Sequence, residues 1–328
     1  MIVSCLLLFI FVLIFEIALC QKTFSIPIRH VKRRDVLGSM RIGERFGQRL
    51  SNTGNMEYRG HVLLGSPPQL FEIVYDTGST SLWVPRKGCT SSGDFARKCW
   101  RVSGPGLYDP DSSSTANDTK QPFEILYNSG MAKGNWFEDK LTLGSADEKQ
   151  LQIPGKVVFG VADKIKFDDI GILGLSLPKP NNTGNSILAL LIDNQLIQEP
   201  IFTSHLKKCS VNGEADNCRS GGQITFGGQD VENCQRTVKV WAPITPGYHW
   251  RFRIDQAKLD GQVIGDSAVA IVDSGTSYIL APFTAYRQII DKLKARQLGR
   301  AILAPCNSSF ELSWTINDVE LRLPSSPN

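Results

Sequence analysis

Two stretches of the chain repeat one pattern: Ile73-Val74-Tyr75-Asp76-Thr77-Gly78-Ser79-Thr80-Ser81-Leu82-Trp83-Val84-Pro85, and Ala270-Ile271-Val272-Asp273-Ser274-Gly275-Thr276-Ser277-Tyr278-Ile279-Leu280-Ala281-Pro282. Each has an apolar run of β type, then Asp-(Thr/Ser)-Gly-(Ser/Thr), a second apolar run, and a proline nine residues after the aspartate. The copies stand 197 residues apart, which is too long for a solenoid period. The repeat therefore indicates two duplicated lobes.

The repeated unit carries chemistry as well as a turn. A strand delivers the aspartate, the glycine permits close approach to another backbone, and the neighbouring hydroxyls can hydrogen-bond a carboxylate. If two such turns meet, Asp76 and Asp273 come together and must share a proton, because two close carboxylates do not both ionise easily. One carboxyl then acts as a base toward water while the other donates to a carbonyl oxygen. A single Asp-x-Gly is ordinarily only a turn, but two copies with matched flanks favour the catalytic interpretation.

These motifs resemble the pepsin-like aspartic peptidases, the family that includes cathepsin D. The resemblance runs from the leader to the end of the chain, and it implies that Asp76 and Asp273 are the catalytic pair. It implies an all-β, bilobal fold with a few short helices. It also implies that Thr77 and Ser274 grip the opposite loop, that Ser79 and Thr276 bond the outer carboxylate oxygens, and that Gly78 and Gly275 form the turns.

Further matches lie in the first lobe. Gly65-Ser66-Pro67-Pro68-Gln69 resembles the family's turn before the first loop, and Tyr127-Asn128-Ser129-Gly130 resembles its flap. The resemblance implies that Tyr127 and Gly130 close over substrate, that Tyr127 bonds to Trp83, and that Ile172 of Gly171-Ile172-Leu173-Gly174-Leu175 lines the cleft behind the first loop. Trp83 and Tyr127 could also be plain core aromatics.

Composition excludes several classes of protein. The chain has 328 residues, 41% of them hydrophobic and 21% charged, which is ordinary for a globular protein and excludes wholesale disorder. The net charge of +4 is concentrated in residues 21–50, and without residues 1–50 it becomes −1. The body is therefore not a basic nucleic-acid binder. No cofactor is implied, since two carboxylates and water suffice.

The N-terminal segment has two parts. Residues 1–20 are an expected signal peptide, although an uncleaved signal anchor is the alternative, because Glu16 interrupts the apolar core and no basic residue precedes it. Residues 21–54 are an expected basic propeptide, since Thr23-Phe24-Ser25-Ile26-Pro27-Ile28 and the basic run resemble the start of the family's propeptide. A cationic strand can cover an acidic cleft, and Arg41 or Arg45 would have to contact the carboxylates. The alternative is an arm that binds anionic surfaces.

Secretion would favour disulfides among the six cysteines that follow the leader. The spacings predict Cys89 with Cys99 and Cys209 with Cys218, and leave Cys234 and Cys306 unassigned. The scattered histidines and the absence of Cys-x-x-Cys argue against a metal site. Asn117, Asn181 and Asn307 begin candidate glycosylation sequons. No second segment is apolar enough to span a membrane, and a secreted or lysosomal monomer is expected.

The lobes are expected at 55–235 and 236–328, with helices at 186–195 and 283–298. The second lobe is expected to be incomplete, because the counterpart of Gly171–Leu175 would lie beyond Asn328. The apolar face around Asp273 would then lack cover, so the chain alone is expected to fold poorly or lack activity.

Three functions remain open. The first is an aspartic endopeptidase, made as a secreted zymogen and acting on polypeptides at acid pH. The second is a catalytically inactive peptide- or protein-binding member of the same fold. The third, a structural glycoprotein, leaves the paired loops unexplained.

Overall fold

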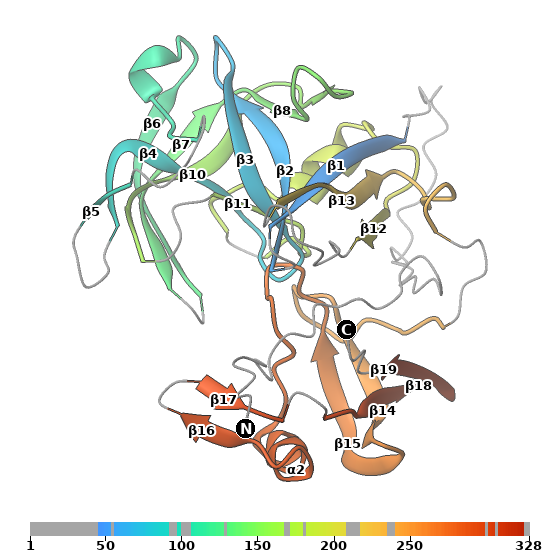
Figure 1. Cartoon of the computed structure of the whole chain (residues 1–328). Coiled ribbons are helices and arrows are strands. Elements are labelled where there is room, and N and C mark those ends of the chain that lie inside the picture. The colour runs from blue at the N-terminus through green and yellow to red at the C-terminus, as the bar shows by residue number, and fades with distance from the viewer. Residues whose placement is uncertain are drawn as a thin grey trace.

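Strands dominate the protein, and they form two bodies that correspond to two lobes (Figure 1). The computed structural model describes residues 45–53, 56–91, 97–99, 106–127, 130–166, 171–179, 182–207, 217–234, 240–298, 301–305 and 308–324. Within those ranges the first lobe holds a 13-stranded sheet and the second a four-stranded sheet and a two-stranded one. The expected all-β, bilobal fold with a few short helices is confirmed.

The main path of the large sheet runs in the order β12-β13-β1-β2-β3-β11-β4-β10-β7-β6, with β5, β8 and β9 attached to its sides. Its strands are β1 (Phe46–Thr53), β2 (Glu57–Leu64), β3 (Gln69–Asp76), β4 (Leu82–Ser91), β5 (Arg97–Lys98), β6 (Asn117–Leu126), β7 (Met131–Asp139), β8 (Leu141–Leu143), β9 (Leu151–Gln152), β10 (Val157–Ile165), β11 (Ile172–Gly174), β12 (Phe202–Leu206) and β13 (Asn217–Phe226). A short 3₁₀ turn, η1 (Pro110–Ser112), precedes β6.

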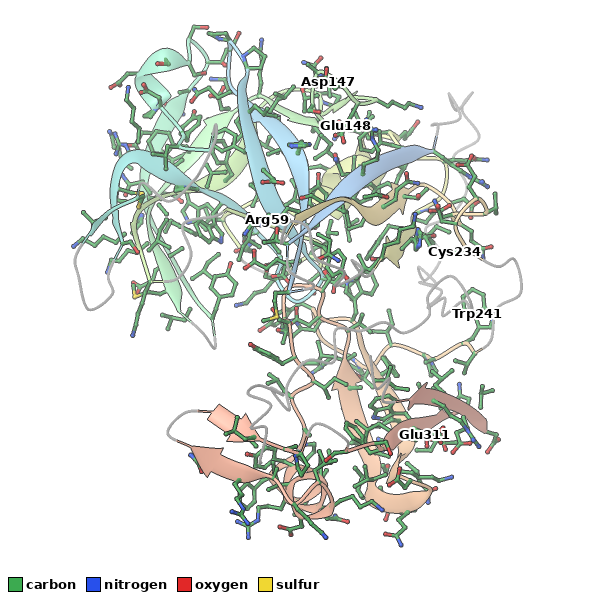
Figure 2. All side chains as sticks on the ribbon, in the orientation of Figure 1. Arg59, Asp147, Glu148, Cys234, Trp241 and Glu311 are labelled. Atoms are coloured by element: carbon green, nitrogen blue, oxygen red, sulfur yellow. A yellow bond between two sulfur atoms is a disulfide. The ribbon has the colours of Figure 1, made fainter. Side chains whose placement is uncertain are left out.

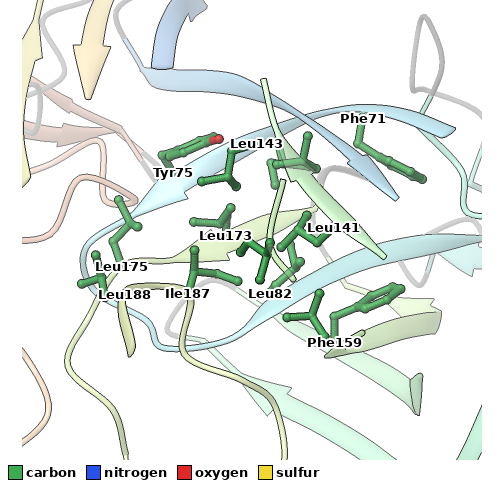
Figure 3. Packing of buried hydrophobic residues seen from close by; sticks show 14 of the residues in the cluster. Phe71, Tyr75, Leu82, Leu141, Leu143, Phe159, Leu173, Leu175, Ile187 and Leu188 are labelled. Atoms are coloured by element: carbon green, nitrogen blue, oxygen red, sulfur yellow. The ribbon is translucent and has the colours of Figure 1, made fainter. Parts of the chain in front are cut away.

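The core of the first lobe forms where alternate apolar side chains of these strands turn inward (Figure 3). Tyr75, Leu82 and Leu173 lie in it fully buried, and α1 (Ile187–Asp193) covers it with Ile187 and Leu188. Ser186 caps this helix by accepting the Ala189 N–H, so the predicted start is confirmed.

The second lobe is smaller and its sheet runs in the order β15-β14-β18-β19. Its elements are β14 (Arg251–Leu259), β15 (Gln262–Ile271), α2 (Phe283–Lys292), β16 (Arg296–Leu298), β17 (Ala301–Leu303), β18 (Glu311–Ile316) and β19 (Val319–Pro324). Helix α2 ends earlier than the predicted residue 298, because Lys294 takes a positive φ of 50° and the chain then enters β16.

Strand β15 leads to Asp273 and is an edge strand within the described residues. Three of its apolar side chains are 44–51% exposed: Val263, Val269 and Ile271. Leu280 and Phe283, which follow the second Asp-Ser-Gly-Thr, are 63% and 71% exposed. Apolar side chains of β15 and of the segment after the second loop are therefore exposed among the described residues.

Candidate active site

The first loop begins at the last residue of β3. Asp76 lies at the end of this strand, opposite Gly174 of the parallel neighbour β11, and is only 5% exposed. The Leu175 N–H donates to the Asp76 carbonyl at 2.7 Å, and the Ser176 N–H donates to the Ser79 carbonyl at 2.8 Å. The segment 171–175 thus passes behind the first loop, as predicted, and fixes its backbone.

The second loop follows β15. The Val272 N–H donates to the Trp250 carbonyl at 3.1 Å, and Trp250 in turn donates its indole N–H to the Leu175 carbonyl at 2.8 Å. One tryptophan therefore links the strand end that leads into the second loop with the segment that passes behind the first loop. Asp273 is half-buried, in contrast to Asp76.

Reciprocal hydrogen bonds join the loops. The Thr77 N–H donates to Ser274 Oγ at 3.0 Å, and the Ser274 N–H donates to Thr77 Oγ1 at 2.9 Å. The two hydroxyls then donate onward to the opposite strands, Thr77 to the Val272 carbonyl at 2.9 Å and Ser274 to the Tyr75 carbonyl at 2.7 Å. The pattern has twofold symmetry, which follows from the sequence repeat.

The two glycines bring the carboxylates together. A Cβ on Gly78 would lie 2.5 Å from the Asp273 carboxyl carbon, and a Cβ on Gly275 would lie 2.4 Å from Asp76 Oδ1. Real Cβ contacts are not that short, so each loop requires a glycine where it faces the opposite aspartate. The sequence repeat therefore places two carboxylates in one site.

Each aspartate is oriented by its own loop. The Gly78 N–H donates to Asp76 Oδ1 at 2.8 Å, and the Gly275 N–H donates to Asp273 Oδ1 at 3.0 Å. Thr276 Oγ1 donates to Asp273 Oδ2 at 2.6 Å, in agreement with its expected role.

Ser79, the counterpart of Thr276, behaves differently. Its Oγ is buried and forms no hydrogen bond of ordinary geometry with any described residue. It nevertheless lies close enough to Asp76 and to Tyr127 to lower the pKa of both groups. Ser79 therefore lies beside Asp76, but without an aligned hydrogen bond of the kind that Thr276 donates to Asp273.

The pKa of Asp76 reflects its burial and its closeness to Asp273. Burial and, after it, the neighbouring Asp273 carboxylate raise the pKa of Asp76 from 3.8 to about 7, against the lowering effect of Ser79 and the Gly78 N–H. Such a pair titrates as a unit and holds one proton over a wide pH range. A base and an acid are thus available side by side.

A hairpin of β6 and β7 lies over the first loop. Trp83 donates its indole N–H to the Tyr127 hydroxyl at 2.8 Å, while Tyr127 and Gly130 exchange backbone hydrogen bonds at the tip. Ile172 and Tyr127 pack against the buried cluster that includes Trp83. Burial and the nearby Asp76 carboxylate raise the pKa of Tyr127, so it remains a neutral phenol. Residues 128 and 129 lie outside the described ranges.

The family profile "Eukaryotic aspartyl protease" matches residues 57–327, which includes both loops and the hairpin. The chain belongs to the eukaryotic aspartyl protease family. Membership of this family assigns the chain to the aspartic-type endopeptidases. Pepsin A of Canis lupus familiaris is 30% identical over 85% of this chain and 70% of its own length. Cathepsin E of Cavia porcellus is 31% identical over 84% and 68%, and gastricsin of Macaca fuscata fuscata is 30% identical over 82% and 69%.

Three of the remaining predicted sites of this aspartyl protease family member have described side chains: Cys89, Cys99 and Asn117. Cys89 and Cys99 form a disulfide with a Cα–Cα separation of 5.4 Å, as predicted, and Cys234 is also disulfide-bonded. Asn117 is exposed at the start of β6, where its amide donates to Glu138 at 2.9 Å. The other predicted positions lie outside the residues whose side chains are described: Asn181, Cys209, Cys218, Cys306 and Asn307.

The described residues hold neither a metal-binding cluster nor a membrane-spanning helix. No group of three or more His, Cys, Asp or Glu side chains there is arranged to hold a metal ion. None of the helices described is both long and apolar enough to traverse a bilayer.

Sequence reasoning missed the residues that precede the aspartates. The carbonyls of Tyr75 and Val272 accept the hydroxyl hydrogen bonds that lock the loops, and Trp250 links Val272 to Leu175 behind the first loop. Tyr75 and Val272 belong to the sequence repeat, since each stands directly before its aspartate. Trp250 stands outside the repeat, and only the folded chain shows its role.

Proposed function

We propose that the chain is an aspartic endopeptidase in which Asp76 and Asp273 activate a water molecule for attack on a peptide carbonyl. The observation that carries this proposal is the contact of each loop's glycine with the opposite carboxylate, Gly78 with Asp273 and Gly275 with Asp76. Nothing in ordinary turn formation requires two remote loops to present carboxylates to each other in this way.

The proposed reaction needs one shared proton. The ionised carboxylate takes a proton from water as its oxygen bonds to the carbonyl carbon, and the protonated carboxyl donates to the carbonyl oxygen. The carboxyl that took the water proton then passes it to the amide nitrogen, and a hydroxyl of the tetrahedral intermediate returns its proton to the other carboxylate as the C–N bond breaks. Burial of Asp76 favours its neutral form, so Asp76 would hold the shared proton before the reaction.

The substrate would be a polypeptide with bulky apolar residues next to the cleaved bond. Ile172 is half-buried beside Tyr127 and Trp83, so the first-lobe side of the site offers apolar and aromatic surface. The Tyr127 ring, held by Trp83, would cover the bound peptide and exclude water from the reacting carbonyl.

We further propose that the protein is made as a zymogen in the secretory pathway and acts outside the cell or in lysosomes. The support is the apolar leader, the basic arm that follows it, and the Cys89–Cys99 disulfide, which suits an oxidising compartment. The arm's positive charge would neutralise the paired carboxylates at neutral pH, and acid would weaken that attraction as carboxylates protonate.

The test is to replace Asp76 by Asn and assay cleavage of a denatured protein at acid pH. Asparagine keeps the shape but removes the titrating group, so cleavage should fall by at least about a thousandfold. Asp255→Asn, at an exposed position on β14, is the matched control and should leave cleavage unchanged. Retained cleavage in Asp76→Asn, or peptide binding without cleavage in the unaltered protein, would contradict the proposal and favour the inactive binding protein.

A further inference from the structure

Trp250 directly precedes β14 of the second lobe, yet its side chain is buried in the core of the first lobe. It is 5% exposed and belongs to the cluster that also contains Leu175 and Leu188 (Figure 3). Its ring packs edge-on against Phe202 of β12, at a centroid distance of 5.5 Å. The side chain therefore anchors the start of the second lobe in the first.

Hydrogen bonds connect this tryptophan to both catalytic loops. Its indole N–H donates to the Leu175 carbonyl at 2.8 Å, and the Leu175 N–H donates to the Asp76 carbonyl at 2.7 Å. The Trp250 carbonyl accepts the Val272 N–H at 3.1 Å, and Val272 directly precedes Asp273. These bonds form a continuous path from Asp76 to the residue next to Asp273.

A second contact aligns the same two segments. The Tyr248 carbonyl accepts the Ser176 hydroxyl, and it also accepts the Leu177 N–H at 2.9 Å. The segment 175–177 passes behind the first loop, and it is thus bonded at both of its ends to the segment 248–250. The indole bond of Trp250 therefore belongs to an ordered junction between the lobes.

The strands that lead into the two loops are supported differently. Strand β3, which ends at Asp76, has hydrogen-bonded neighbours on both sides, β2 and β11. Strand β15, which leads to Asp273, is an edge strand within the described residues. The position of Asp273 therefore depends more on contacts with the other lobe, and the path through Trp250 is one of them.

Packing alone would not require a tryptophan at this position. A phenylalanine could fill much of the same space, but the buried Leu175 carbonyl would lose its indole donor. A buried polar group without a partner is unfavourable, so the two segments would shift to regain one. The Val272 N–H bonds to the backbone of Trp250 itself, and the second loop would shift with it.

We propose that Trp250 is a positioning residue for Asp273, and that its indole N–H holds the second catalytic loop against the segment behind the first. The inference rests on the proposed peptidase function and adds to it a residue that acts through Val272. Loss of the indole bond should leave the fold in place and misalign the two carboxylates.

The first experiment measures peptide hydrolysis by Trp250→Phe. The kcat should fall about ten- to hundredfold with a much smaller change in KM, because misplaced catalytic groups chiefly slow the chemical step. Trp241→Phe makes the same change at a 43% exposed position, toward the right-hand side of Figure 2, and should leave kcat unchanged. Phe202→Leu weakens the packing of Trp250 but keeps its N–H, so it should lower the Tm and largely retain kcat. A kcat for Trp250→Phe that is no lower than that of Phe202→Leu would overturn the proposal.

Two analogues of tryptophan isolate the N–H group. Replacement of Trp250 by 3-benzothienylalanine exchanges the N–H for sulfur in a ring of nearly the same shape, and should reproduce the loss of kcat. Replacement by 5-fluorotryptophan retains the N–H and should restore kcat. Equal kcat values for the two analogues would contradict a role for the indole hydrogen bond.

The pH profile is a readout that lost packing alone would not change. The Asp273 carboxylate contributes, after burial, to the raised pKa of Asp76, and Tyr127 is the other titratable group that interacts with Asp76. If the second loop moves away, the pKa of Asp76 should fall. The alkaline limb of kcat/KM should then move to lower pH in Trp250→Phe, and an unshifted limb would count against the proposal.

The last experiment does not depend on activity, so it separates failure of this inference from failure of the proposed function. In the full chain carrying Asp76→Asn, amide hydrogen exchange is followed by mass spectrometry in the peptide 268–280, with and without Trp250→Phe. Exchange in this peptide should be faster with Trp250→Phe and unchanged with Trp241→Phe, while the peptide 311–316 of β18 serves as the internal reference. Equal exchange with and without Trp250→Phe would overturn the inference even if the protein cleaves peptides.

Discussion

Thr77 and Ser274 hydrogen-bond each other in both directions, with each backbone N–H donating to the other's hydroxyl at 2.9–3.0 Å. The residues are 197 positions apart, so this exchange joins the two lobes at the point where the aspartates meet. Both bonds are partly buried, and the hydroxyls have onward partners in the opposite strands.

Thr77→Val should separate the loops while keeping the shape of the side chain. The Ser274 N–H would lose its acceptor and the Val272 carbonyl would lose its donor, at a cost of about 1–3 kcal/mol in unfolding free energy. The measurement is urea unfolding together with kcat and KM for a peptide substrate, and kcat should fall more than KM rises. Ser274→Thr keeps the hydroxyl and is the control, which should retain both stability and kcat.

The raised pKa of Asp76 predicts a stability that declines toward neutral pH. A group with a folded pKa of about 7 and an unfolded value of 3.8 contributes fully below about pH 4, and this contribution is lost as the pH rises through 7. The Tm measured from pH 4 to 8 should therefore fall more steeply in the unaltered protein than in Asp76→Asn, which cannot titrate. Parallel curves for the two proteins would show that folding does not raise the pKa of Asp76.

Asp139 should make stability depend on pH in the opposite direction from Asp76. Its carboxylate is fully buried and accepts from the hydroxyls of Tyr108, Ser113 and Thr115 at 2.5–2.7 Å and from the Lys140 N–H at 2.8 Å. Burial alone would raise the pKa of Asp139, but these hydrogen bonds outweigh it and hold the pKa below 3.8.

Stability from Asp139 is therefore present above about pH 4 and is lost as the pH falls through its lower folded pKa. Asp139→Asn should cost roughly 3 kcal/mol at pH 6 and less at pH 2.5, as measured by chemical unfolding at both values. A cost that does not change with pH would mean that the charge of Asp139 contributes nothing. Asp266→Asn, on the exposed side of β15, is the comparison.

The substitution Tyr127→Phe tests whether the hydrogen bond between Trp83 and Tyr127 holds the β6–β7 hairpin over the site. The substitution keeps the ring over the site but removes the hydroxyl that accepts the Trp83 N–H. The ring should then hold its closed position less well, and kcat/KM should fall about tenfold, equivalent to about 1.4 kcal/mol. The assay is peptide hydrolysis with the Tm as control. An unchanged kcat/KM would remove Tyr127 from the proposed mechanism.

The exposed apolar side chains of β15 predict self-association. Val269→Thr and Ile271→Thr keep the β-branched shape on this edge strand and remove exposed apolar surface, so together they should raise the fraction of monomer seen by light scattering. Val161→Thr, at a buried position of β10, is the contrasting variant and should lower stability without any gain in solubility. A double variant that aggregates as readily as the unaltered protein would contradict this account.

Much of the site could be predicted from the sequence because the repeat carries it. Asp76, Gly78 and their counterparts occupy matched positions, and the symmetric bonds of Thr77 and Ser274 follow from that match. The bond expected from Ser79 could not be predicted in the same way, because it depends on the direction of one hydroxyl.

Other features depend on pairing between remote segments. The expected propeptide included β1 because this part of the chain is basic, with Arg41, Arg45 and Arg49. The buried face of β1 is also difficult to recognise from sequence, because it contains the polar residues Gln48 and Asn52. Only the pairing with β13 shows that this face is internal. Helical spacing likewise extended α2 past Lys292, whereas the backbone turn at Lys294 is a local conformation that periodicity does not report.

The pairing of Phe46 with Phe226 also sets an order of events during synthesis. The partner strand of β1 leaves the ribosome only after nearly all of the first lobe has been made, so β1 must wait for it while β2 and β3 can already pair. Contacts between such distant positions slow folding and leave a nascent chain open to wrong pairings. A chain released before Phe226 would lack the strand that closes the first lobe. The cell's quality-control machinery would then encounter a chain with an incomplete sheet.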